Sequence, residues 1–308
     1  VLEHLTTWDG LRQATVMTTL QDSQGFVWLG TEDGLVRFDG HELYRYARAR
    51  TDTGSLPGNF IWQVVEDSQG DLWLAVKDAG VARWNRRTDT FTTYRHDPSN
   101  PSSLPSDSVR AVLVDARGYV WIGTSDAGVG VLDPASGRVE RLRHDPADSA
   151  SLGSDNVSML APDRAGNVWI GTEKGLNRWS PDTRALTRVG PPAAAPGSVS
   201  EAQILRVVED RSGALWVGTF NAGLVRMDRD GRVLQTFPDE WTRFGADDRG
   251  HHDGAAQDRY RQRHAIERFE RELNEDERPV GESHHDAVSQ RRAERKGVHR
   301  QERVGDRP

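Results

Sequence analysis

The stretch DARGYVWIGTSDAGVGVLD, residues 115–133, decides the fold of this chain because four near-copies of it occur elsewhere in the sequence. The copies read DSQGFVWLGTEDGLVRFD from residue 22, DSQGDLWLAVKDAGVARWN from residue 67, DRAGNVWIGTEKGLNRWS from residue 163 and DRSGALWVGTFNAGLVRMD from residue 210. Successive copies of the tryptophan are 45–48 residues apart, at Trp28, Trp73, Trp121, Trp169 and Trp216. A period of this length is typical of repeat architectures, in which each copy is one structural unit.

The first half of each copy is expected to form two short strands. The first strand ends at the aspartate, as at residues 109–115, and the second carries the Trp-x-Gly-Thr run. A D-x-x-G turn joins them, because Asp accepts hydrogen bonds from turn amides and Gly adopts the left-handed conformation. The turn pairs are Asp22 with Gly25, Asp67 with Gly70, Asp115 with Gly118, Asp163 with Gly166, and Asp210 with Gly213.

The second half of each copy supplies two further strands. A second glycine-containing turn leads to a third strand such as residues 130–133. The fourth is an outer strand, in which polar and apolar residues alternate. We expect the outer strands at residues 41–46, 90–95, 138–143, 186–189 and 232–237.

Four strands in every 40–50 residues predict an all-β fold, a β-propeller of four-stranded blades. The five recognisable blades span about residues 12–46, 60–95, 108–144, 156–189 and 202–237, inside a repeat region of residues 1–239. One such sheet cannot bury both of its faces alone, so neighbouring blades must stack.

The repeated tryptophan is expected to pack in the core between blades rather than to stack on a ligand. Burying its side chain contributes at most about 4–6 kcal/mol. The small residue two positions later is expected to let the next sheet approach closely. That residue is Gly30, Ala75, Gly123, Gly171 or Gly218 in the successive copies.

Composition excludes several classes of function. The formal net charge of −7 at pH 7 argues against a protein that binds nucleic-acid phosphates. The chain has no cysteine, which excludes disulfides and thiolate metal sites. No apolar run approaches the roughly 18 residues of a membrane-spanning helix. P-loop, H-E-x-x-H, G-x-S-x-G and G-x-G-x-x-G motifs are absent, so we expect no catalytic residue, no metal site and no cofactor.

The five copies resemble the two-component regulator propeller repeat, whose pattern is D-x-x-G-x-[LVI]-W-[LIV]-G-T-x-x-G-[LV]. The resemblance covers about residues 8–239, and four copies carry W-[LIV]-G-T intact. It implies a periplasmic, ligand-sensing module of a bacterial sensor histidine kinase or diguanylate cyclase. In that family the propeller precedes a transmembrane helix and a cytoplasmic output domain, so membrane contact is expected only through a segment missing downstream.

The chain departs from this family in its number of blades. Family propellers commonly have seven, whereas five are recognisable here. Residues 1–7 are interpreted as an outer strand donated to a last blade, yet the fifth copy has its own outer strand. We therefore expect an incomplete propeller whose open edges allow a homodimer to form.

Residues 240–308 do not continue the repeat. They contain 31 charged residues in 69 and few large apolar ones, which favours a disordered or partly helical tail. Three interpretations stay open: a natural disordered tail, translation in a wrong reading frame that truncates the propeller before the output domain, and a functional charged arm. The pairs His251–His252 and His284–His285 in this tail are interpreted as loop or disordered histidines.

An enzyme similar to streptogramin lyase is the alternative function, because its propeller shares a related repeat. That activity needs a histidine that breaks the repeat beside a cation. Arg-His-Asp-Pro occurs at residues 95–98 and 143–146. A metal or anion site between His96 and His144 is conceivable, but loop chemistry is favoured. His41, expected in the first outer strand, and His4 are the other candidates in the repeat region. A protein-interaction scaffold is a third hypothesis.

Ligand binding is expected where the loops of a propeller converge on one face. The hairpin loops between the second and third strands differ from copy to copy in charge and size, as recognition of an asymmetric ligand requires. The expected partner is a small molecule such as a glycan. The candidate binding residues are Glu32, Asp33, Lys77, Asp78, Ser125, Asp126, Glu173, Lys174, Phe220 and Asn221.

Overall fold

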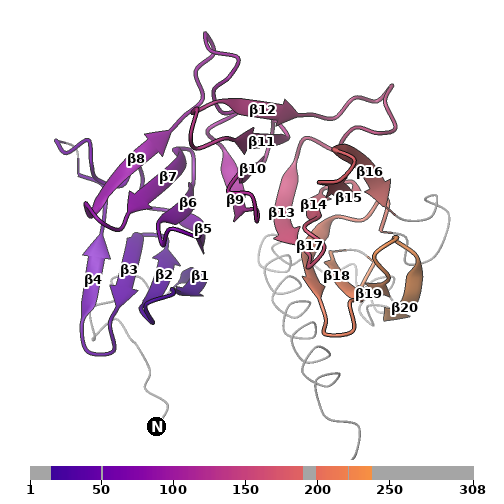
Figure 1. Ribbon diagram of the computed structural model, residues 1–308, viewed down its shortest axis with the longest axis horizontal. Helices are drawn as coiled ribbons and strands as arrows, with labels where there is room; N and C mark the ends of the chain where they lie inside the picture. Colours follow the sequence, from indigo (N-terminus) through magenta and orange to yellow (C-terminus); the bar gives the residue numbers. More distant parts are fainter. Residues whose placement is uncertain (1–14, 50, 190–198, 221, 238–308) are drawn as a thin grey trace, which may run out of the picture. The chain divides into compact units, whose positions relative to one another are not determined.

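The computed structural model describes residues 15–49, 51–189, 199–220 and 222–237. These residues form twenty strands in five antiparallel sheets of four, and within each sheet the strands follow chain order (Figure 1). The all-β fold of five four-stranded blades predicted from the repeat is therefore confirmed.

The strand bounds repeat closely from sheet to sheet. Sheet 1 contains β1 (Val16–Gln21), β2 (Val27–Thr31), β3 (Gly34–Phe38) and β4 (Leu43–Tyr46). Sheet 2 contains β5 (Ile61–Glu66), β6 (Leu72–Val76), β7 (Gly80–Asn85) and β8 (Thr90–Tyr94). Sheet 3 contains β9 (Val109–Val114), β10 (Val120–Thr124), β11 (Val129–Leu132) and β12 (Val139–Leu142). Sheet 4 contains β13 (Val157–Pro162), β14 (Val168–Thr172), β15 (Gly175–Ser180) and β16 (Ala185–Val189). Sheet 5 contains β17 (Ile204–Glu209), β18 (Leu215–Thr219), β19 (Leu224–Met227) and β20 (Val233–Phe237).

Several strand ends differ from the sequence prediction by one or two residues because side chains cap the turns. The prediction placed His41 in the first outer strand, but β4 begins only at Leu43. The carboxylate of Asp39 accepts hydrogen bonds from the backbone amides of His41 and Glu42 at 2.8 and 2.7 Å, which holds both residues in the turn. Similarly, β11 ends before Asp133, whose carboxylate accepts hydrogen bonds within the turn that follows.

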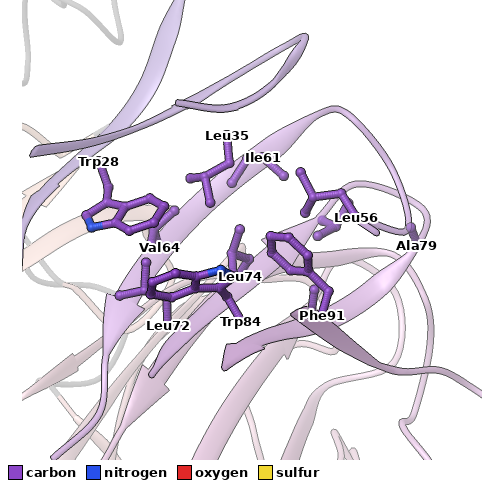
Figure 2. Packing of buried hydrophobic residues seen from close by; sticks show 12 residues of the cluster. Trp28, Leu35, Leu56, Ile61, Val64, Leu72, Leu74, Ala79, Trp84 and Phe91 are labelled. Carbon is purple, nitrogen blue, oxygen red and sulfur yellow. The ribbon is translucent and has the colours of Figure 1, made fainter. Parts of the chain in front are cut away.

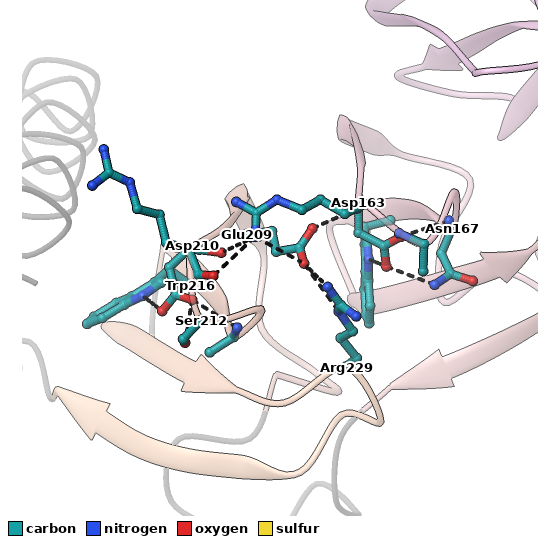
Figure 3. Close-up of polar contacts among 12 residues, drawn as sticks. Asp163, Asn167, Glu209, Asp210, Ser212, Trp216 and Arg229 are labelled. Carbon is teal, nitrogen blue, oxygen red and sulfur yellow. Dashed lines mark hydrogen bonds and ion pairs between the residues drawn. The ribbon is translucent and has the colours of Figure 1, made fainter. Parts of the chain in front are cut away.

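The D-x-x-G turn and the tryptophan are joined by a hydrogen bond that the sequence analysis did not foresee. In sheet 1, Oδ1 of Asp22 accepts the turn amides of Gln24 and Phe26, while Oδ2 accepts the indole N–H of Trp28 at 2.9 Å. The same indole bond occurs in the other sheets as Trp73–Asp67, Trp121–Asp115, Trp169–Asp163 and Trp216–Asp210, at 2.9, 3.1, 2.9 and 3.0 Å. Figure 3 shows the bond between Trp216 and Asp210. One carboxylate thus closes the turn and orients the buried indole.

These bonds also affect the ionisation of the carboxylates. Burial by itself would raise the pKa of Asp22, but hydrogen bonds from Trp28, Arg86 and two turn amides outweigh burial and hold the pKa below its usual value. The pKa of Asp210 is lowered for the same reason, by bonds that include those from Ser212 and Trp216. The hydrogen bonds of the turn therefore stabilise the charged form of these two carboxylates.

Four of the five repeat tryptophans pack against the following sheet, as the sequence predicted; Trp216 lies in the last sheet that the structure describes. Trp28 is fully buried in a cluster made largely by sheet 2, which includes Ile61, Leu72 and Trp84 (Figure 2). Equivalent clusters place Trp73 against sheet 3, Trp121 against sheet 4 and Trp169 against sheet 5. The first strands β1, β5, β9, β13 and β17 lie side by side in this order. Burial of the tryptophan therefore couples each sheet to the next.

The glycine after the tryptophan allows this close contact. A Cβ atom at Gly30, Gly123 or Gly171 would lie 3.0, 2.7 or 2.8 Å from a methyl carbon of the first residue in the next sheet. Those residues are Ile61, Val157 and Ile204 respectively. The prediction that a small residue here admits the next sheet is confirmed at these three positions. At Gly218 it stays a prediction.

Two pairs of sheets are held together by a glutamate and an arginine, which we call the Glu–Arg clamp. In sheet 2, the carboxylate of Glu66 accepts the backbone N–H and the hydroxyl of Ser23 in sheet 1, at 2.8 and 2.6 Å. Arg86 donates to Glu66 at 3.0 Å and to Asp22 of sheet 1 at 2.8 Å. The clamp thus fixes the turn of one sheet to the edge of the next.

The same clamp joins sheets 4 and 5. Glu209 accepts the backbone N–H of Arg164 at 2.7 Å and pairs with Arg229, in the manner of Glu66 and Arg86 (Figure 3). At the position of this glutamate, sheets 3 and 4 carry Val114 and Pro162, so the clamp does not occur between sheets 2 and 3 or between sheets 3 and 4.

Replacing Glu66 with glutamine is expected to lower the free energy of unfolding by about 1–2 kcal/mol, because the charge-assisted bond with Arg86 is lost in a largely buried site. Chemical denaturation of the full chain measures this change. The matched control is Glu140→Gln, since Glu140 lies 3.9 Å from Arg184 in an exposed pair and its loss should cost less than about 0.5 kcal/mol. Equal effects of the two substitutions would contradict the role of the clamp.

Several sequence predictions lie outside the described residues. They concern residues 1–7 as a donated strand, the boundary at residue 239 and the character of residues 240–308. These remain predictions, as does the incomplete closure of the propeller.

Candidate ligand-binding face

The hairpin loop between the second and third strands of a sheet lies beside two entry segments, the residues that lead into first strands. In sheet 2, the Lys77 amide donates to the carbonyl of Phe60, in the entry segment of the same sheet. The Gly80 amide donates to the carbonyl of Asp107, in the entry segment of sheet 3. Analogous bonds recur as Ser125–Ser108, Gly128–Asp155, Glu173–Asn156, Gly175–Ala202 and Phe220–Gln203, each at 2.9 Å. We call the end of the sheets made by these loops and entry segments the loop face.

The predicted binding residues that the structure describes therefore lie on the loop face, but they contact entry segments rather than the residues of the next hairpin loop. Ser108 shows this arrangement, because its hydroxyl donates to Asp78 at 3.3 Å and its carbonyl accepts the Ser125 amide. Asp126 likewise accepts a hydrogen bond from Ser106 at 3.1 Å. These carboxylates therefore help to hold the loops in place.

The remaining predicted residues differ in their contacts and exposure. Asp33 forms an ion pair with Arg45 at 2.7 Å and accepts a hydrogen bond from Asn59. Glu173 and Lys174 are exposed in the hairpin of sheet 4. Glu32 is exposed and Phe220 partly buried in their hairpins, and Asn221 lies outside the described residues.

An aromatic platform on the loop face was missed by the sequence analysis. The rings of Phe60 and Trp62, at the start of β5, lie 4.5 Å apart with an interplanar angle of 50°. The ammonium of Lys77 lies 5.2 Å from the centre of the Phe60 ring, and the guanidinium of Arg110 lies 5.8 Å from that of Trp62. Both aromatic side chains are partly exposed. The platform therefore consists of two partly exposed rings, each with a cation over its face.

A signal for the platform was present in the sequence. At the position of Trp62, the other first strands carry Met17, Arg110, Ser158 and Leu205, so only one copy has an aromatic residue there. A consensus of the five copies does not contain a residue that occurs in only one of them, because the consensus includes only shared residues. Comparison of the copies residue by residue would have found it.

The histidines of the two Arg-His-Asp-Pro runs belong to separate loops. The ring Nδ1 of His96 lies 2.7 Å from the carbonyl oxygen of Leu104, and that of His144 lies 2.6 Å from the carbonyl oxygen of Leu152. Each imidazole therefore holds its own inter-sheet loop. Within the described residues, no group of three or more His, Cys, Asp or Glu side chains could hold a metal ion.

Comparison with known proteins finds similarity to one repeat family over part of the chain. Four segments match the family described as two component regulator propeller: residues 10–33, 55–78, 103–126 and 151–174. Histidine kinase P4 of Formosa agariphila is 41% identical over 56 residues, which is 18% of this chain and 4% of that protein.

Solved structures share the fold at low sequence identity. The extracellular domain of a one component system of B. thetaiotaomicron matches with a TM-score of 0.58 and 24% identity, over 76% of this chain and 33% of that one. The extracellular domain of a hybrid two component system of the same organism matches with a TM-score of 0.51 and 23% identity, over 77% and 36%. Virginiamycin B lyase of Staphylococcus aureus, crystallised with quinupristin, matches with a TM-score of 0.53 and 13% identity, over 72% and 69%.

The chain therefore spans about a third of the length of the extracellular domains that it resembles, and far less of the matched kinase. Within the described ranges, no helical segment has the length and hydropathy that crossing a bilayer requires.

Proposed function

Because this chain carries repeats of the two-component regulator propeller family, we propose that it is the ligand-sensing propeller of a bacterial signal-transduction protein and acts outside the cytoplasm. The observation that carries the proposal is the match of four successive repeats to that family, together with a fold found in extracellular domains of a one component and a hybrid two component system. The propeller is proposed to bind its ligand without catalysis and to pass the signal to an output domain in another part of the protein.

The aromatic platform is the proposed contact for the ligand. Partly exposed aromatic rings offer flat apolar surfaces that stack on the face of a ring-shaped ligand such as a sugar. Lys77 lies over the Phe60 ring and Arg110 over the Trp62 ring, and these cations add donors and positive charge at the platform. Binding sites commonly combine aromatic surface with a few polar groups that fix orientation. A glycan is therefore the ligand class that the platform fits best.

The test is a thermal-shift screen of the full chain against neutral and acidic sugars, with wild type and Trp62→Ala compared. A ligand of the platform should raise the melting temperature of wild type, and the affinity should fall at least tenfold in Trp62→Ala because the stacking surface is lost. The ligand-induced shift decides the test, since removal of Trp62 can lower basal stability as well.

Tyr44→Ala is the matched control for this screen, because Tyr44 is an aromatic residue of β4 that is 42% exposed and does not belong to the platform. It should bind the same sugars with unchanged affinity. Sugar binding that survives in Trp62→Ala, or a screen in which no sugar raises the melting temperature, would refute the platform as a glycan site.

A lyase activity is disfavoured by the positions of His96 and His144. Each imidazole contacts a carbonyl oxygen of its own loop, and His41 lies in an exposed turn. The similarity to virginiamycin B lyase is one of fold alone. Conversion of any bound ligand into product, followed by chromatography, would overturn the proposal that the propeller is not catalytic.

A further inference from the structure

A cavity of about 470 Å³ lies between sheets 3 and 4, away from the aromatic platform. Sheet 3 contributes the turn residues Arg117 and Tyr119 and parts of β11 and β12. Sheet 4 contributes Trp179, Arg184 and Leu186. Its volume lies within the range of small-molecule sites, which is roughly 300–1,000 Å³.

The equivalent gap between sheets 1 and 2 is filled by side chains. There the ring of Tyr46 lies 6.2 Å from that of Trp84 and 5.8 Å from that of Phe91. The carboxylate of Asp89 accepts the indole N–H of Trp84 at 2.8 Å and the hydroxyl of Tyr46 at 2.9 Å. Burial and the bond to Asp89 raise the pKa of Tyr46 to about 12. Two aromatic rings and one carboxylate thus complete this gap.

Sheet 4 keeps the tryptophan but lacks the carboxylate. Trp179 aligns with Trp84 in the repeat, and Arg184 aligns with Asp89. The two turns have the same backbone geometry, because Asp89 and Arg184 have φ values of 53° and 52°. Trp179 is only 8% exposed, and its indole N–H makes no hydrogen bond with any described residue. This indole N–H therefore lacks the acceptor that Trp84 has in Asp89.

The two aromatic rings are also replaced by smaller side chains. Leu142 stands at the position of Tyr46, and Leu186 at that of Phe91. The Glu–Arg clamp is absent as well, because Pro162 and Pro181 occupy its two positions in sheet 4. The cavity therefore lies where the rings and the carboxylate are missing.

The charged groups around the cavity are three arginines and two carboxylates, those of Asp133 and Glu140. Arg117, paired with Asp115, lies 4.8 Å from the ring centre of Trp179 and thus covers one side of the cavity. Arg138 and Arg184 add two more cations to the lining, and Glu140, also in the lining, lies 3.9 Å from Arg184 in an exposed pair. The carboxylate of Asp133 already accepts hydrogen bonds within its own turn. This lining favours a ligand that accepts hydrogen bonds and carries negative charge.

We propose that this cavity binds a small aromatic carboxylate. Its ring would take the place that Tyr46 and Phe91 occupy in the filled gap. Its carboxylate would do what Asp89 does there, accepting the indole N–H of Trp179, with Arg138 and Arg184 supplying the positive charge. The site is independent of the aromatic platform and of the sugar ligand proposed there.

The experiment titrates the ¹⁵N-labelled full chain with benzoate, phenylacetate and 4-hydroxyphenylacetate. The indole N–H resonance of Trp179, assigned by its absence in Trp179→Phe, should shift in a saturable way with at least one of these acids. The neutral amide phenylacetamide should produce no such shift. The double substitution Arg138→Gln and Arg184→Gln should weaken binding at least tenfold, because two charge-assisted contacts are lost.

Arg232→Gln is the matched control, because Arg232 precedes β20 as Arg138 precedes β12. It should bind the acids as wild type does. A second variant, Leu142→Tyr with Arg184→Asp and Leu186→Phe, recreates the filled gap and should abolish binding while it raises the melting temperature.

Should this triple variant fail to fold, Leu186→Phe alone should reduce binding at least tenfold. The proposal would be overturned if none of the acids shifts the indole N–H resonance of Trp179 in the wild-type protein. Undiminished binding in a folded variant with the gap filled would overturn it as well.

Discussion

Replacing Trp169 with alanine is expected to lower the free energy of unfolding by about 3–5 kcal/mol. The side chain is fully buried between sheets 4 and 5, where it packs with Ile204 and Leu215. Removing it leaves a cavity that rigid β-sheets cannot close, and it also leaves the carboxylate of Asp163 without its indole donor. Chemical denaturation of the full chain, followed by circular dichroism, measures the change.

A second substitution separates the ring from its hydrogen bond. Trp169→Phe keeps most of the apolar volume but removes the N–H, so it should cost about 1–2 kcal/mol. Asp163 would still accept the side-chain amide of Asn167 at 2.8 Å. Leu234→Ala is the control, because Leu234 is 52% exposed and its truncation should have little effect. A Trp169→Ala protein as stable as the Leu234→Ala protein would show that the tryptophan does not couple the sheets.

The features that the sequence predicted are those that all copies share. Trp121, Asp115 and Gly118 recur in register, so their spacing predicts the strand order, the first turn and the burial of the indole. The hydrogen bond between Asp115 and Trp121 joins residues six positions apart across a hairpin. It follows from the geometry of the turn, which sequence spacing alone does not determine.

The features that the sequence missed come from single copies. Trp62 and Phe60 interrupt the repeat only in sheet 2. The change at Arg184 is seen only when the turn of sheet 4 is aligned with that of sheet 2, where Asp89 occupies the same position. Their meaning depends on which side chain of the neighbouring sheet faces them. The sequence could predict that these hairpin loops share one end of the sheets, because loops of one type lie at one end of a sheet; ligand binding there stays a prediction. The predicted binding residues are distributed over the five sheets, since each blade contributes one hairpin loop.

The close approach of successive sheets makes a further strong prediction at Gly123. Gly123→Ala should lower the free energy of unfolding by about 1–3 kcal/mol, because overpacking forces neighbouring atoms apart. The added Cβ would lie 2.7 Å from a methyl carbon of Val157, the first residue of β13, and 3.3 Å from Cβ of Ala111. Denaturant unfolding of the full chain measures the loss.

Sheet 2 provides the matched comparison, because Ala75 occupies the position of Gly123 and is fully buried there. Ala75→Gly should therefore also destabilise, by about 0.5–1 kcal/mol, since it removes a packed methyl group and adds backbone freedom. The clash at Gly123 is tested further with Val157→Ala. If the contact causes the loss, the double variant Gly123→Ala with Val157→Ala should be more stable than the sum of the two single effects predicts. Strict additivity would mean that the distance between sheets 3 and 4 is not set by this contact.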